Sequence, residues 1–293
     1  MRLLVLGGSG MLGHKLCQVL SADFDVSATF RSAGTELPEI YGATRPIGGV
    51  DALAFDSVAK AVEVARPDVV INAIGIVKQR ATAHDPVLSI SVNSLFPHRL
   101  ATLCRASHAR LIHFSTDCVF SGRRGDYSED DDPDPVDLYG RSKLLGEVEG
   151  AGILTIRTSI IGRELENLTG LLEWFLGRAG TRVPGFARVI WSGVTTNYLA
   201  SVVGKLAQTS PGVDGIFHLS GPPISKYDLL IALNDAFGTA TTVEPDETVV
   251  SDRSLNSDRF WSRTGLMRPT WNDMLSELAE DSRLYQRKVN AGR

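Results

Sequence analysis

A tyrosine and a lysine four positions apart, Tyr139 and Lys143, are the residues of this sequence best suited to chemistry. On a helix, residues four apart lie on one face, so the two side chains are expected to project together. An ammonium beside a phenol favours the phenolate and lowers the phenol's pKa from its reference of about 10. A tyrosine tuned in this way can exchange a proton with a carbonyl oxygen near neutral pH. The alternative is a solvated helical pair without function, which is common.

Two hydroxyl residues, Ser115 and Thr116, end a predicted strand over residues 111–115. The Thr116 hydroxyl can donate a hydrogen bond to the same carbonyl oxygen and stabilise the charge that develops on it. Ser115 is the rival for this role. Neighbours on a strand point to opposite faces, so only one of the two is expected to face the site.

The chain begins with an apolar run over residues 3–6, followed by glycines at positions 7, 8, 10 and 13. In a strand, glycine turn and helix start of this kind, backbone N–H groups hold a diphosphate where no Cβ blocks its approach. A tight turn that binds nothing is the alternative. We favour a dinucleotide cofactor, because the glycines lie directly between a predicted strand and a predicted helix. Because the turn, the Ser-Thr strand end and the Tyr-Lys pair then follow in the required order, we also favour catalysis over a solvated pair for Tyr139 and Lys143. The residues predicted to contact it here are Gly7, Ser9, Gly10, Met11 and Leu12.

The type of cofactor is indicated by Arg31, which follows a predicted strand over residues 26–29. An NAD-specific site usually carries an acidic residue there, whereas an arginine suits the extra phosphate of NADP(H). Asp51 is predicted to accept a hydrogen bond from the adenine amino group, although a turn residue is the alternative. At the end of the strand over residues 69–73, small residues are predicted beside the diphosphate and ribose, and Asn72 can instead tie backbone groups together. These residues are Asn72, Ala73, Ile74 and Gly75.

Strand-like and helix-like segments alternate from residue 1 to about 158, which predicts an α/β fold with a Rossmann-type doubly wound parallel sheet. The predicted strands are 3–6, 26–29, 69–73, 111–115 and 154–157, and the predicted helices are 11–20, 57–65, 87–105 and 142–149, with Asp56 as an N-cap for the second helix. Ligands of such a fold bind at the carboxyl ends of its strands.

The alternation loosens after residue 158, where helices are predicted over residues 171–178, 198–208, 227–237 and 274–284. We therefore predict a cofactor domain over residues 1–158 and a smaller C-terminal α/β substrate lobe over residues 159–293. This division leaves open that one segment of the second part returns to the main sheet.

The composition excludes several classes of protein. The 293 residues are 43% hydrophobic and 22% charged, which is ordinary for a globular protein. A net charge of -4 lacks the basic footprint of nucleic-acid or anionic-membrane binding, and no stretch reaches the about 18 apolar residues of a membrane span. Three scattered cysteines indicate a reducing, cytoplasmic compartment, and no residue spacing suggests a metal site.

Together these motifs resemble those of extended short-chain dehydrogenases/reductases, and within them the dTDP-4-dehydrorhamnose reductases. The family pattern Ser-Thr-Asp-Tyr-Val-Phe-Asp-Gly is similar to residues 115–122, and Tyr-Gly-x-x-Lys-x-x-x-Glu is similar to residues 139–147. Residues 227–230 and 269–271 also resemble family segments, so the similarity spans nearly the whole chain. The resemblance implies that Thr116, Tyr139 and Lys143 are catalytic, that Lys143 also binds the nicotinamide ribose, and that Asn93 supports the site.

The departures from the family pattern concern the substrate. Cys118 replaces a tyrosine, Ile160 replaces a tryptophan, and residues 191–196 replace the segment Asp-Gln-x-Gly-x-Pro-Thr. The substrate lobe is therefore expected to be rebuilt around a retained reductive centre. The residues predicted to contact substrate are Asp117, Cys118, Ile160, Trp191, Val194, Thr195 and Tyr227.

The resemblance implies an NADPH-dependent reduction of the keto group of a nucleoside-diphosphate 4-keto-6-deoxy sugar, and leaves a homodimer open. One alternative is a nucleotide-sugar epimerase or dehydratase, which typically retains NAD tightly, whereas Arg31 indicates an exchangeable NADP(H). Another is a non-catalytic NADP-binding regulatory subunit. The complete set of Thr116, Tyr139 and Lys143 argues against it, because such a subunit has no chemical reason to keep a proton donor.

Overall fold

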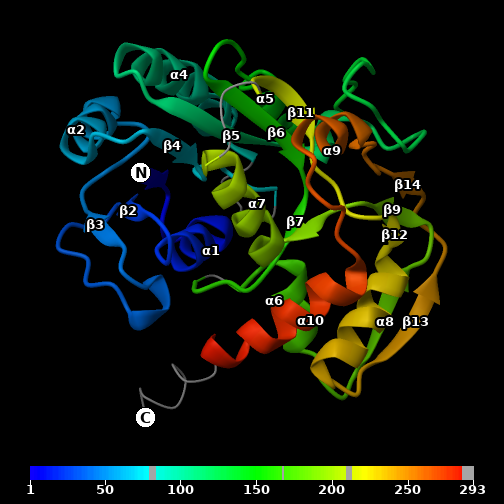
Figure 1. The fold of residues 1–293 in the computed structure, drawn as a ribbon. Helices are drawn as coiled ribbons and strands as arrows, with labels where there is room; N and C mark the ends of the chain where they lie inside the picture. Colours follow the sequence, from blue (N-terminus) through cyan, green and yellow to red (C-terminus); the bar gives the residue numbers. More distant parts are fainter. Residues whose placement is uncertain (79–83, 167, 209–212, 286–293) are drawn as a thin grey trace.

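The computed structural model describes residues 1–78, 84–166, 168–208 and 213–285. Its centre is a seven-stranded parallel sheet with the strand order β11-β6-β5-β4-β1-β2-β3 (Figure 1). The strands are β1 (Arg2–Leu6), β2 (Asp25–Thr29), β3 (Arg45–Ile47), β4 (Val69–Asn72), β5 (Arg110–Thr116), β6 (Ile153–Thr158) and β11 (Gly215–His218). The order runs outward from β1 in both directions, which confirms the predicted doubly wound sheet.

The strands are apolar because helices cover both faces of the sheet. Residues 3–6 are at most 1% exposed, as expected for a parallel strand buried on two sides. In the register, Leu6 pairs with Asn72, and Asn72 pairs with His113. The carboxyl ends of β1, β4 and β5 therefore lie side by side, so the segments that follow them meet at one edge of the sheet.

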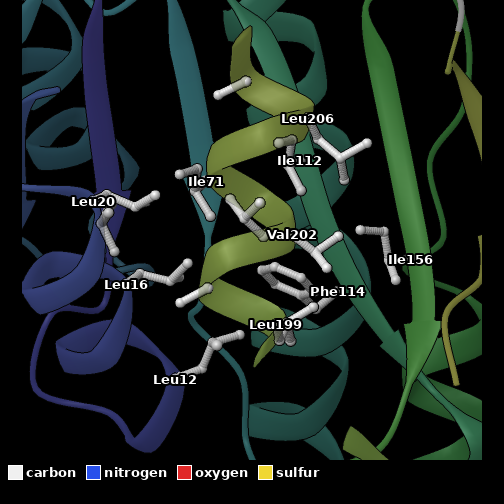
Figure 2. Close-up of a cluster of buried hydrophobic side chains, with 14 of the residues drawn as sticks. Leu12, Leu16, Leu20, Ile71, Ile112, Phe114, Ile156, Leu199, Val202 and Leu206 are labelled. Atoms are coloured by element: carbon white, nitrogen blue, oxygen red, sulfur yellow. The ribbon is translucent and has the colours of Figure 1, made fainter. Parts of the chain in front are cut away.

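Two helices from opposite halves of the chain share one face of the sheet. They are α1 (Met11–Leu20) and α7 (Thr196–Gln208), and they lie side by side (Figure 1). Each presents an apolar stripe with helical spacing to the strands. Figure 2 shows Leu12, Leu16 and Leu20 of α1 and Leu199, Val202 and Leu206 of α7 packed with Ile71, Ile112, Phe114 and Ile156 of the sheet. The second half of the chain thus completes the core of the first.

The other face of the sheet packs against α2 (Phe55–Ala65) and α4 (Phe96–Ala106). A continuous helical run leads into α4 through α3 (Pro86–Ser89) and η3 (Ile90–Leu95), and α5 (Leu138–Leu144) packs against η3. Leu111 belongs to this second core and Ile112 to the first, because successive side chains of a strand point to opposite faces.

The rest of the chain forms a smaller lobe with short strands. Its sheets pair β7 (Ile160–Ile161) with β10 (Val194–Thr195), β9 (Val189–Trp191) with β12 (Ile224–Ser225) and β14 (Ser251–Asp252), and β8 (Arg182–Phe186) with β13 (Thr242–Asp246). Its helices are α6 (Leu171–Leu176), α8 (Lys226–Phe237) and α10 (Trp271–Asp281), whereas α9 (Asp258–Thr264) packs against β11 at the edge of the main sheet. Single 3-10 turns lie at η1 (Glu39–Tyr41) and η4 (Asp117–Val119). Across the residues that the structure describes, no helix combines the length and apolarity that crossing a bilayer demands.

Several elements differ from the sequence-based expectation. β11 is the segment of the second part that returns to the main sheet, beside β6, a possibility that the sequence analysis left open, while β3 and α9 were not predicted at all. The helix predicted from residue 142 begins at Leu138 instead, because the Asp137 side chain caps it by accepting from the Gly140 N–H at 2.8 Å. The N-cap assignment of Asp56 is wrong, since α2 begins at Phe55 and places Asp56 inside the first turn.

Candidate active site

A cavity of about 350 Å³ lies at the edge of the sheet where β1, β4 and β5 end. Its lining combines the start of α1, the segment after β4, the end of β5, part of α5 and three segments of the smaller lobe. The predicted catalytic and cofactor residues that line it are Gly10, Met11, Leu12, Asn72, Ala73, Ile74, Gly75, Thr116, Tyr139 and Lys143. Gly7, Ser9, Arg31, Asp51 and Asn93 lie outside this lining.

The glycine turn leaves the start of α1 uncovered. Gly7 has a φ of +88°, a left-handed conformation that favours glycine, and its N–H donates to the Thr29 hydroxyl at 3.1 Å. A Cβ on Gly13 would collide with the Gly7 carbonyl oxygen, so the helix packs directly on the turn. At Gly10 no side chain caps α1, and no acidic residue lies in its first turn. The N-terminal N–H groups of this helix therefore remain available to an anion at the cavity.

Arg31 and Asp51 lie together near the ends of β2 and β3. The Phe30 N–H donates to the Ile47 carbonyl, and the Val50 N–H donates to the Phe30 carbonyl, which brings the two segments into contact. The Arg31 side chain is exposed, whereas Asp51 accepts from the Leu53 N–H at 2.9 Å through Oδ1. Asp51 thus shapes a turn, as its alternative interpretation expected, and its contact with adenine stays a prediction.

Two asparagines hold the segment after β4 in place. The side-chain oxygen of Asn72 accepts from the Ile74 N–H at 3.1 Å. Asn93, on η3, accepts from the Ile76 N–H at 2.9 Å and donates to the Ile76 carbonyl at 3.1 Å. Asn93 also donates to the Ser142 hydroxyl at 3.2 Å, so it connects this segment to α5. Its position explains a supporting role without contact to the cavity.

The Lys143 side chain is buried beneath the cavity on α5. Its Nζ donates to the Phe114 carbonyl oxygen at 2.6 Å, which fixes the ammonium beside the end of β5. Burial lowers the pKa of Lys143 to about 8, and the Glu147 carboxylate opposes this shift. The ammonium is therefore charged at neutral pH but loses its proton far more readily than an exposed lysine.

Tyr139 is half-buried on the same helix and interacts with Thr116. Burial raises the pKa of Tyr139 above its ordinary value, Cys118 raises it further, and a hydrogen bond with Thr116 opposes both. The expectation of a lowered pKa is thus wrong for this arrangement, because removal from water disfavours the phenolate and the Lys143 ammonium is not among the groups that shift the pKa. The phenol is protonated at neutral pH, which suits a proton donor.

The structure distinguishes between the two neighbouring hydroxyls at the end of β5. Ser115 donates to Glu147 at 2.7 Å, and that carboxylate forms an ion pair with Arg157 at 2.8 Å in which both side chains are 5% exposed. Thr116 instead donates to the Asp117 carboxylate at 3.1 Å and contacts Tyr139. Ser115 is therefore held by a buried ion pair, and Thr116 is the hydroxyl associated with the tyrosine.

The residues predicted to contact substrate separate into two groups. Those that line the cavity are Asp117, Cys118, Ile160 and Trp191. Val194 and Thr195 are fully buried, and Tyr227 packs against the apolar core of the smaller lobe, so none of the three belongs to the lining. Their contact with substrate stays a prediction.

Lys226 lines the cavity but was missed by the sequence analysis. Its Nζ lies 3.6 Å from the centre of the Trp191 ring. The predicted helix began one residue later, at Tyr227, so Lys226 was not considered as a helix residue. A usable signal was present, because a lysine at the first position of a helix opposes the helix dipole and needs a reason.

Comparison with known proteins gives a family match over residues 1–283, described as "RmlD substrate binding domain". The chain is similar to "Probable low-salt glycan biosynthesis reductase Agl14" of Haloferax volcanii, with 27% identity over 94% of this chain and 96% of that protein. It is 32% identical to a dTDP-4-dehydrorhamnose reductase of Mycolicibacterium smegmatis, over 81% of this chain and 69% of that protein. It is also 28% identical to methionine adenosyltransferase 2 subunit beta of Danio rerio, over 80% and 74% respectively.

Solved structures with the same fold include a dTDP-4-dehydrorhamnose reductase from Bacillus anthracis in complex with NADP. It has a TM-score of 0.76 and 21% identity, and the match covers 94% of this chain and 98% of that chain. A UDP-glucose 4-epimerase from Thermotoga maritima with UDP-glucose has a TM-score of 0.78 at 14% identity, covering 98% and 100%. At these identities the likeness establishes the fold alone.

Proposed function

This chain belongs to the RmlD substrate binding domain family, and from that premise we propose that it reduces the keto group of a nucleotide sugar with NADPH. The observation that carries the proposal is one cavity lined by Thr116, Tyr139, Lys143 and the uncapped start of α1. Relatives named as reductases support the type of reaction. The substrate class that we propose is a nucleoside-diphosphate 4-keto-6-deoxy sugar.

The start of α1 fits the diphosphate of such a cofactor. The glycine turn leaves room for its approach, and the first N–H groups of the helix lie at the positive end of the helix dipole. We assign the extra phosphate to Arg31, the adenine to Asp51 and the nicotinamide ribose to Lys143, with the segment 72–75 beside the diphosphate. The solved relative with NADP supports this cofactor.

Bound NADPH supplies the hydride that reduces the carbonyl carbon. Tyr139 donates its phenolic proton to the carbonyl oxygen, because its raised pKa keeps that proton in place at neutral pH. Thr116 turns its hydroxyl from Asp117 to the same oxygen and stabilises the developing negative charge. The Lys143 ammonium stabilises the phenolate that remains after the transfer.

The decisive experiment is to incubate the purified protein with NADPH and a panel of nucleoside-diphosphate keto sugars. The expected result is oxidation of NADPH by at least one 4-keto-6-deoxy sugar, with stoichiometric formation of the corresponding alcohol. A protein that binds NADPH but oxidises it with no keto sugar of the panel would contradict the proposal.

A second candidate is a role as a subunit of another enzyme, which the similarity to methionine adenosyltransferase 2 subunit beta favours. Such a role does not require a proton donor beside a buried lysine, and here both residues line the cavity. The same NADPH oxidation assay separates the two candidates. Release of exchangeable NADP(H) on dialysis, rather than retention of NAD, separates a reductase from an epimerase.

A further inference from the structure

Lys226 lines the cavity and places a positive charge at the start of a helix, where a negative charge would be stabilising. It is the first residue of α8, a helix of 12 residues whose N-terminal end carries the positive side of the dipole. The rest of this helix start follows the stabilising pattern, since the Ser225 hydroxyl accepts from the Asp228 N–H at 2.9 Å. Neutral or acidic side chains would serve the helix better, so the lysine needs another explanation.

The Lys226 Nζ contacts an aromatic ring but no hydrogen-bond acceptor of the described residues. Its Nζ lies over the face of Trp191 at 3.6 Å from the ring centre, and Trp191 is only 4% exposed. Between Lys226 and any residue that the structure describes, there is no hydrogen bond or ion pair through Nζ. Burial lowers the pKa of Lys226 to about 7, and the charge of Asp117, which forms no ion pair with it, opposes this shift. The amino group is held in place while its N–H donors remain uncommitted, and an anionic oxygen beside it would favour the ammonium.

We propose that Lys226 binds an anionic oxygen of the substrate, supplied by the diphosphate or by a carboxylate on the sugar. The inference deepens the proposed function, on which it rests, by assigning a recognition residue to the substrate side of the same cavity. The cation–π contact orients the ammonium, and an incoming anionic oxygen gives its N–H groups the partner that the protein does not provide. A carboxylate would make the substrate a sugar acid instead of a 6-deoxy sugar.

Binding measurements test this without turnover. Uridine diphosphate, thymidine diphosphate, uridine diphosphate glucose and uridine diphosphate glucuronate are titrated calorimetrically into the NADP⁺-saturated protein. Lys226→Met removes the charge at similar length, Lys226→Arg retains it, and Lys60→Met makes the same change at an exposed position of α2. Thermal unfolding and NADP⁺ affinity verify folding, and Lys226→Gln replaces the methionine variant if that variant does not fold.

If the oxygen belongs to the diphosphate, Lys226→Met weakens binding of all four probes by about tenfold or more, and Lys226→Arg restores most of it. If it belongs to a carboxylate, wild-type protein prefers the glucuronate, and Lys226→Met abolishes only that preference. Equal affinities for wild type, Lys226→Met and Lys60→Met would overturn the inference, as would a wild type that binds none of the probes. Failure of the reductase assay with these binding differences intact would refute the proposed reaction alone.

Discussion

The two walls of the cavity are built from different kinds of element. The sheet wall carries Ser115, Thr116, Tyr139 and Lys143, and the lobe wall carries Ile160, Trp191 and Lys226. On one wall, the end of β5 is fixed by a long parallel pairing with β6 that extends from Leu111 to Thr116. On the other, Ile160 belongs to a two-residue strand whose partner β10 also has two residues. Long strands in a central sheet hold side chains rigidly, whereas short pairings leave their positions to packing. The first wall is thus suited to the proposed proton transfer, and the second to selection of a substrate.

The two walls also differ in whether their hydrogen-bond donors have acceptors within the protein. On the sheet side, Ser115, Thr116 and Lys143 each donate to a defined oxygen of the protein. On the lobe side, the indole N–H of Trp191 is buried without a hydrogen-bond partner in the described residues, and Lys226 packs on its ring. A buried donor without an acceptor costs free energy. These three donors of the sheet side therefore already have acceptors within the protein, while the Lys226 ammonium on the lobe side has donors that a ligand can satisfy.

Tyr139→Phe tests whether the sheet wall supplies the proton for the proposed reduction. Loss of the phenolic proton is expected to lower kcat by about 100-fold to 10,000-fold, the usual contribution of a positioned acid. NADPH affinity and the unfolding temperature should remain at wild-type values. Tyr198→Phe is the matched control, because that hydroxyl donates to the Met267 carbonyl outside the cavity. Near wild-type turnover of Tyr139→Phe would assign the proton transfer to another group.

Arg31→Ala tests whether Arg31, near the end of β2, determines the preference for NADPH over NADH. A guanidinium paired with a phosphate contributes about 1.5–3 kcal/mol, so the KM for NADPH should rise by about 10-fold to 100-fold. NADH lacks this phosphate, and its KM should hardly change. Exposed Arg66, at the end of α2, provides the control substitution Arg66→Ala. Equal losses with both cofactors would give Arg31 a role other than phosphate recognition.

The pH dependence of NADPH binding tests whether the Lys143 ammonium contacts the cofactor. Burial lowers the pKa of Lys143 to about 8, so its ammonium is present below that pH and is lost as the pH rises through it. NADPH affinity of the wild type should therefore fall by up to about tenfold between pH 7 and pH 9, which one lost charge-assisted hydrogen bond allows. Lys143→Met should bind weakly and without this pH dependence. A wild-type titration that is flat over the range would contradict the assignment.

The sheet wall could be predicted from sequence because its signals are local. The glycine turn, the Ser-Thr strand end and the Tyr-Lys pair each lie within one short segment, and a parallel sheet necessarily brings the carboxyl ends of its strands to one edge. The pKa of Tyr139 could not be predicted, since it depends on burial by distant segments. The start of α5 was missed because the cap at Asp137 precedes the apolar pattern.

Ile160 and Trp191 of the lobe wall were predicted, but how the wall is assembled could not be, because its residues come from three separate segments. Ile160, Trp191 and Lys226 meet only through tertiary packing, and no short motif joins them. Gly193 illustrates the difficulty, because a Cβ there would collide with the Trp191 ring, so a single missing side chain decides where the indole lies. The family resemblance predicted a rebuilt substrate lobe, but not that Lys226 lies in this wall.

Cys118 lies where the two walls meet, and its substitution should have the smallest effect. It follows Thr116 on the sheet side, where its backbone N–H donates to the Thr116 hydroxyl at 3.1 Å and its thiol interacts with the Thr116 and Asp117 side chains. Burial and the Asp117 carboxylate raise the pKa of its thiol to about 12, so the thiolate is scarce at pH 8 although the side chain is partly exposed. Cys118→Ser preserves the backbone contact and should change kcat by less than about threefold, which is less than the contribution of one neutral hydrogen bond.

Iodoacetamide at pH 8 should label the folded protein slowly, whereas urea-unfolded protein reacts at all three cysteines. Rapid labelling of Cys118 with loss of activity would mean that a reactive thiolate lies beside Tyr139, and the sheet wall would then contain a nucleophile as well as an acid.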